Sequence, residues 1–115
     1  MERNQYIPVM IQSLKKKSEI LDTIMELNIR QSEELENPAL DPDDFDKTVE
    51  EKSKQIEKLD LLDDGFQELF DRVKDDLKNH QDIYRDEIAQ MQDYIRKLTS
   101  KSATIQVQEA QIGRA

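Results

Sequence analysis

The carboxylate pairs of this chain are its most obvious candidates for acid–base chemistry. Two carboxylates act as general acid and general base only in a cleft that separates their pKa values. Adjacent residues on a helix point in different directions, so we expect these pairs to be solvated helix faces. The pairs are Glu33/Glu34, Glu50/Glu51, Asp63/Asp64, Asp75/Asp76 and Asp86/Glu87.

Calcium and zinc are the two metals that the residue types suggest. Asp41, Asp43 and nearby acids resemble the start of an EF-hand loop, but Asp46 replaces the required Gly and Lys52 replaces the twelfth-position Glu. His80 is the only histidine and there is no Cys, so a usual zinc site lacks ligands. A thin helical bundle also lacks a nucleophile elbow and an oxyanion hole. We expect no metal, no cofactor and no enzymatic activity, with Asp41 and His80 at helix ends.

The charge of the chain limits its classes of partner. The 115 residues carry a formal net charge of −9, and the sequence pI is about 4.6. This balance argues against nucleic acid and against anionic membrane surfaces. The lysine run Lys15–Lys17 is the only basic cluster, and we expect it to be a solvated helix face. With no signal-type apolar core and no stretch that approaches a membrane span, we expect a cytoplasmic protein without membrane insertion.

An apolar repeat, with steps that alternate between four and three residues, runs from Phe45 almost to the end of the chain. A spacing that averages 3.5 residues forms one stripe along an α-helix, which another helix must cover. Asp63 and Glu87 fall on this stripe, and we expect them to mark local openings or to pair with Lys or Arg of another helix. The repeat comprises Phe45, Val49, Lys52, Ile56, Leu59, Asp63, Phe66, Phe70, Val73, Leu77, His80, Tyr84, Glu87, Met91, Tyr94, Leu98, Lys101, Ile105, Gln108 and Ile112.

The first segment of the chain has the same spacing. Two polar residues, Asn28 and Gln31, interrupt its apolar stripe. Buried polar residues of this kind fix the alignment of helices at some cost in stability, whereas exposure at a fraying helix end is the alternative. The positions are Ile7, Met10, Leu14, Lys17, Leu21, Ile24, Asn28, Gln31 and Leu35.

Two breaks divide these stripes. Pro38 and Pro42 disfavour helical geometry at the residues before them. Asp41 is then predicted to cap the next helix, with Pro42 at its first position. The second break falls at Gly65, at Asn79 or nowhere, and a turn near Asn79 gives three helices of matched length.

We therefore predict an all-α fold with one domain, an antiparallel three-helix, up-down-up, coiled-coil-like bundle. The helices are expected at about 4–36, 42–78 and 81–112, with a linker at 37–41. Each helix would be about 50 Å long. The alternative is an uninterrupted helix from Pro42 to Ile112, about 105 Å long, in a long helical hairpin that dimerises.

The last segment carries more apolar residues than a small bundle easily hides. Packing on the first two helices is one explanation, and a groove for the amphipathic helix of a partner is the other. Met and aromatic residues suit such a groove because they adapt and bury large areas. Ile83 and Tyr94 extend this face. The candidate partner-binding residues are Tyr84, Ile88, Met91, Ile95, Leu98, Ile105 and Ile112.

Four stretches cover most of the chain in an order typical of a known family. They are Leu14–Leu27, Asp44–Gly65, Phe66–Leu77 and Tyr84–Glu109. They supply a Leu-rich helix, a short acidic linker, a helix start with the pattern D-x-F…V-E-E-K and a late helix with the pattern I-Q-x-x-E. In this combination the chain resembles flagellar-operon export chaperones of the FlgN/FliT type, in the short variant found in Clostridia-like bacteria.

The resemblance implies a small, acidic, non-enzymatic, cytoplasmic chaperone. Such a protein binds the terminal helix of a flagellar secretion substrate, a hook-associated or filament-cap protein, and delivers it to the export machinery. The resemblance places this binding on the C-terminal helix, about Tyr84 to Ile112. The alternative function is that of a structural coiled-coil protein, which forms a homodimer through the same stripe.

Overall fold

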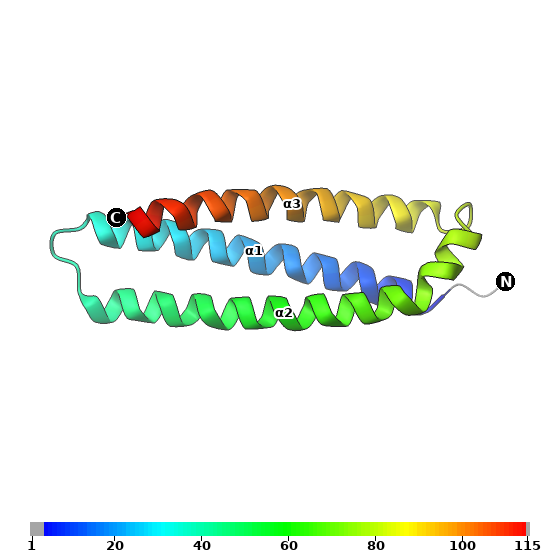
Figure 1. Cartoon of the computed structure of the whole chain (residues 1–115), viewed down its shortest axis with the longest axis horizontal. Coiled ribbons are helices and arrows are strands. Elements are labelled where there is room, and N and C mark those ends of the chain that lie inside the picture. Colours follow the sequence, from blue (N-terminus) through cyan, green and yellow to red (C-terminus); the bar gives the residue numbers. More distant parts are fainter. Residues whose placement is uncertain (1–3, 115) are drawn as a thin grey trace.

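The chain folds into three long antiparallel helices, and the predicted all-α, up-down-up bundle is confirmed. The computed structural model describes residues 4–114. The helices are α1 (Tyr6–Glu36), α2 (Pro42–Asn79) and α3 (Arg85–Arg114). Figure 1 shows α1 between α2 and α3 along the whole length of the molecule. The principal-axis extents of 63 × 20 × 16 Å describe a rod rather than a sphere.

The first break lies where the prolines predict it. Asn37, which precedes Pro38, has φ −84° and ψ 117°, an extended conformation that ends α1. The Asp41 side chain accepts a hydrogen bond from the backbone N–H of Asp43 at 3.0 Å, so Asp41 is the N-cap of α2. Pro42 follows at the start of the helix, where a missing N–H has no cost.

The second break lies at the end of α2, at Asn79. His80 follows as the C-cap with φ −133° and ψ 42°, and its backbone N–H bonds to the carbonyl of Asp76. The expectation that His80 lies at a helix end is confirmed. Gly65 lies inside α2 without interrupting it. Because residues 80–84 form turns, the alternative of one helix from Pro42 to Ile112 is wrong.

The central helix α1 supplies most of the core. It packs on both α2 and α3, whereas no Cα atoms of α2 and α3 approach within 8 Å of each other over residues 4–114. Directly packed helices have axes 8–10 Å apart, so α2 and α3 do not close a three-sided bundle. The hydrophobic core consists of Ile7, Met10, Leu14, Leu21, Ile24, Val73, Leu77, Tyr84, Met91 and Leu98.

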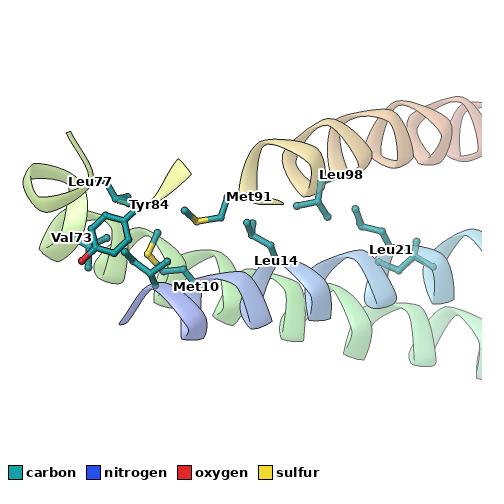
Figure 2. Packing of buried hydrophobic residues seen from close by; sticks show 10 residues of the cluster. Met10, Leu14, Leu21, Val73, Leu77, Tyr84, Met91 and Leu98 are labelled. Atoms are coloured by element: carbon teal, nitrogen blue, oxygen red, sulfur yellow. The ribbon is translucent and has the colours of Figure 1, made fainter. Parts of the chain in front are cut away.

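This core is concentrated toward the α2–α3 turn. Figure 2 shows Tyr84 next to Val73, Leu77 and Met10 at this end of the bundle. Full burial of a large apolar side chain contributes about 1.5–3 kcal/mol, so this end is the better anchored one. Toward the α1–α2 loop, the buried residues include polar ones, namely Asn28, Gln31, Thr48 and Gln55.

Candidate functional site

The most distinctive surface feature is a groove between α2 and α3, close to the turn that joins them. Its volume is about 830 Å³. Because α2 and α3 do not pack directly on each other, apolar side chains of both helices remain accessible along this groove. We call it the α2–α3 groove. Its apolar lining residues are Met10 of α1, Phe66, Phe70 and Leu77 of α2, and Ile88, Ala89, Met91 and Ile95 of α3.

Two lining residues reach solvent although they are large and apolar. Phe70 is 39% exposed and Ile95 is 46% exposed, so one accessible apolar side chain comes from each wall. Leu77 and Met91 lie deeper and are buried in the core. The bottom of the groove is therefore formed by apolar residues of the hydrophobic core, and its rim by apolar residues that remain exposed to solvent.

An ion pair holds one wall of the groove in place. Lys17 of α1 pairs with Asp63 of α2, and its Nζ lies 5.6 Å from the centroid of the Phe66 ring. Phe66 stacks on Phe70 with 6.5 Å between the ring centroids and 12° between the planes. The cation–π contact and the stacked rings fix the orientation of these aromatic side chains. Of the two alternatives for Asp63, a local opening or pairing with a basic residue of another helix, the structure shows the pairing.

The prediction that the lysine run is a solvated helix face holds for two of its three residues. Lys15 and Lys16 are exposed, as expected for a solvated face. The Lys17 side chain is only 15% exposed, so the prediction is wrong for this residue. It is wrong because Lys17 occupies an apolar-stripe position opposite Asp63, where its stem is buried and its charge is paired.

The charged lining of the groove is mostly basic. Lys74 and Lys78 lie near the end of α2, and Arg85 begins α3, whereas Asp82 in the turn is the one acidic residue that lines the groove within residues 4–114. Lys74 Nζ lies 3.9 Å from an Asp71 carboxylate oxygen, and both side chains are exposed, so this pair is weak. The basic character of this rim contrasts with the net charge of −9 of the whole chain.

A polar layer joins all three helices at the opposite end of the bundle. Lys52 Nζ of α2 lies 3.0 Å from Asn28 Oδ1, 2.9 Å from Gln31 Oε1 and 2.8 Å from Glu109 Oε1 of α3. Asn28 also donates to Gln108 Oε1 at 3.1 Å. Asn28 and Gln31 are 0% and 1% exposed. These two residues therefore align the helices, and the alternative of a fraying end is wrong.

A second polar cluster closes the other end of the bundle. The Asp76 carboxylate accepts hydrogen bonds from the Asn4 side-chain amide and the Tyr84 hydroxyl, both at 3.2 Å, and from His80 Nδ1 at 2.9 Å. The bond from Asn4 lowers the pKa of Asp76 most, those from Tyr84 and His80 lower it further, and burial opposes them. This cluster ties the start of α1 to the α2–α3 turn.

The structure divides the predicted partner-binding residues into two groups. Tyr84, Met91 and Leu98 are buried in the core of the chain itself, and Ile88 and Ile105 are partly buried against this core. Packing within the bundle, the alternative explanation of this face, thus accounts for most of it. Ile95, at 46%, is the most exposed of the seven, while Ile112 is half-buried near the end of α3.

The groove brings together Ile88, Met91 and Ile95 from the predicted set and adds residues that the sequence argument missed. The sequence predicts a binding face on the last segment alone, so it misses the whole α2 wall, together with Met10 of α1 and Arg85 and Ala89 of α3. Phe70 carried a signal, since the aromatic positions Phe66 and Phe70 fall on the apolar repeat. Nothing in the sequence pattern showed that α2 and α3 would stay apart.

Comparison of the chain with protein-family models, with curated proteins and with solved structures gave no significant match. Within residues 4–114, none of the helices combines the length and the apolar character that crossing a membrane requires. The same described residues contain no group of three or more His, Asp or Glu side chains placed to hold a metal ion.

Proposed function

We propose that the chain is a helix-binding protein whose α2–α3 groove receives the amphipathic helix of a partner. The observation that carries this proposal is the groove itself, with exposed Phe70 on one wall and exposed Ile95 on the other. A fourth helix in the groove would cover both side chains at once. The helix-in-groove mode of recognition uses apolar anchors of this kind.

The dimensions of the groove suit a short helix. Its α2 wall runs from Phe66 to Lys78, which corresponds to about 18 Å at about 1.5 Å per residue. A helix of about 12 residues, or three to four turns, spans this length. Its anchors would stand at i, i+3 or i+4, and i+7, facing Phe70, Met91 and Ile95.

The resemblance to flagellar export chaperones supplies a client for this groove. We propose that the partner is the terminal helix of a hook-associated or filament-cap protein, and that the chain holds this helix in an export-competent state in the cytoplasm until it reaches the export machinery. The proposed binding residues lie on both walls of the groove, whereas the resemblance places them on the last helix alone. Masking an apolar helix in this way requires no catalytic group and no cofactor.

Self-association is the second candidate function, and one pattern favours it. Val49, Ile56 and Phe70 are 42%, 43% and 39% exposed. Their positions differ by multiples of seven, so they lie on one side of α2. A second copy of the chain that packs along this side would form a homodimer through a coiled-coil seam.

A binding titration with two matched double variants tests the proposed function. The ligands are the terminal segments of the hook-associated and filament-cap proteins encoded in the same genome, labelled for fluorescence anisotropy. Phe70→Glu/Ile95→Glu changes one exposed residue on each groove wall. Leu61→Glu/Val107→Glu changes two residues that are 72% and 60% exposed and lie outside the groove lining, again one on α2 and one on α3.

We expect one of these segments to form a 1:1 complex with the chain. The groove variant should weaken it at least about tenfold, as expected when apolar anchors at the centre of an interface are lost, and the control variant should change it less than about twofold. Equal effects of the two variants would refute the groove as the binding site. Sedimentation of the chain alone distinguishes helix binding from self-association. If the chain is an obligate dimer and Phe70→Glu/Ile95→Glu dissociates it, self-association is supported instead.

A further inference from the structure

We infer that the helix received by the α2–α3 groove carries acidic side chains at the end that lies beside Lys74, Lys78 and Arg85. This inference rests on the proposed function and specifies the chemistry of the partner. It concerns the polar flanks of the partner helix, whereas the apolar anchors are set by Phe70, Met91 and Ile95.

The charges of the groove carry the inference. Among the described residues, Lys74, Lys78 and Arg85 line it together with one acid, Asp82. Lys78 and Arg85 form no ion pair with any residue in the described range 4–114, and the Lys74–Asp71 pair at 3.9 Å is an exposed and weak one. Three cations at one end of an apolar groove therefore remain available to a ligand.

The position of the three cations along the groove determines which end of the partner helix carries the acidic residues. All three cations lie near the α2–α3 turn, at the last two turns of α2 and the first residue of α3. At the other end, the apolar lining begins at Phe66, whose neighbouring cation Lys17 is already paired with Asp63. Acidic residues on a bound helix thus find partners at the turn end, but not at the Phe66 end.

The negative net charge of the chain restricts where acidic residues of the partner helix can bind favourably. At −9 the molecule as a whole repels an acidic ligand, but ionic screening limits such repulsion to about 8 Å at physiological salt. The attraction by the three cations therefore exceeds this repulsion only for acidic residues that lie within about 8 Å of them. Complementarity of this kind selects the partner and its orientation more than it adds affinity.

A displayed peptide library tests the inference and does not require the natural ligand. The probe is a phage-displayed set of 14-residue helices with Leu, Ile, Phe or Met at the anchor positions i, i+3, i+4, i+7 and i+11 and random residues elsewhere. It is selected on the full chain and counter-selected on Phe70→Glu/Ile95→Glu. The same selection is repeated on Lys74→Glu/Lys78→Glu and on Lys15→Glu/Lys54→Glu, a control pair of exposed lysines outside the groove lining with the same change in net charge.

We expect Asp and Glu to be enriched at one end of the helices selected on the natural chain and on the control variant. On Lys74→Glu/Lys78→Glu, Lys and Arg should replace them at that end. A selected acidic peptide should bind this variant about tenfold more weakly than it binds the control variant, and the difference should shrink with added salt.

The two possible failures are distinguishable. If peptides that depend on Phe70 and Ile95 are selected but show the same charge preference on all three proteins, the groove binds helices and the acidic partner is wrong. If no peptide depends on Phe70 and Ile95, the groove itself is not a helix-binding site, and the proposed function and this inference are both overturned.

Discussion

Lys52 of α2 contacts both other helices at the polar end of the bundle. Its ammonium lies within hydrogen-bond distance of Asn28 and Gln31 of α1 and of Glu109 of α3. Glu109 is 42% exposed, so water weakens this ion pair. The buried amides depend more strongly on Lys52, because a buried polar group without a partner costs far more than an exposed one.

Lys52→Met is therefore expected to lower the free energy of unfolding by about 1–3 kcal/mol, the cost of leaving buried acceptors unpaired. Methionine keeps the apolar stem of the side chain and removes only the ammonium. Urea denaturation followed by circular dichroism measures the change. Lys47→Met, at a side chain that is 77% exposed, is the control, and equal stabilities of the two variants would show that the polar layer does not stabilise the fold.

Asp76 gives the fold a dependence on acid pH. Its pKa is lowered from the ordinary value of 3.8, first by the hydrogen bond from Asn4. The folded state therefore binds the proton more weakly than the unfolded state does. This contribution to stability is complete above the unfolded pKa and is lost as the pH falls through the folded pKa.

Asp76→Asn should accordingly flatten the loss of stability below about pH 4, since the amide cannot titrate. Urea midpoints measured from pH 6 down to pH 2 would show it. Asp75→Asn, at the adjacent exposed carboxylate, is the matched control. A curve for Asp76→Asn that parallels that of Asp75→Asn at every pH would contradict the proposed role of the cluster.

For the helices, sequence features that act locally predict the helix ends better than they predict how the helices pack. Pro38, Pro42 and the Asp41 cap are local, so the start of α2 is predicted within the sequence itself. The end of α2 has no comparable turn chemistry, and only the matching of helix lengths favours Asn79 over Gly65. The distance between α2 and α3 depends on packing across the whole bundle, so the α2 wall of the groove was not predicted.

Gly65 provides a test of the continuity of α2. An added Cβ at this position would meet no atom within 4 Å beyond its chain neighbours and the adjacent backbone of its own helix. No glycine among the described residues has a positive φ. Gly65→Ala should raise the free energy of unfolding by about 0.5–1 kcal/mol, because alanine is the better helix former. Thermal unfolding measures this gain.

Gly113→Ala is the control for Gly65, since it makes the same change one residue from the end of α3. Its effect should be much smaller, because terminal helical turns contribute little to stability. Destabilisation by Gly65→Ala would mean that the chain bends at Gly65 in solution.

Considered as a whole, the molecule is an elongated three-helix bundle that is open between α2 and α3. The Cα radius of gyration is 18.1 Å, whereas a compact chain of this length has about 13 Å. One central helix contacts two flanking helices that do not contact each other closely. On the open side, apolar rim residues occur together with Lys78 and Arg85, which form no ion pair within residues 4–114, and this combination supports the function proposed for the groove.

Small-angle X-ray scattering should show an elongated monomer whose longest dimension is close to the 63 Å extent of the fold plus a hydration layer. This expectation follows from the turn at residues 80–84, which brings α3 back along α1. The uninterrupted helix would instead give a particle at least about 105 Å long. A dimension of that size, together with the mass of a dimer, would contradict the three-helix arrangement.

Occupation of the α2–α3 groove by a partner helix is directly testable by methyl NMR. The chain, labelled at its Ile, Met and Val methyl groups, is titrated with the terminal segment of a hook-associated or filament-cap protein from the same genome. We expect the signals of Ile88, Met91 and Ile95 to shift progressively. Those of Ile29 and Val107, both outside the groove lining and more than half exposed, should stay in place. Shifts confined to Ile29 and Val107, or no shift at any concentration of any such segment, would contradict occupation of the groove.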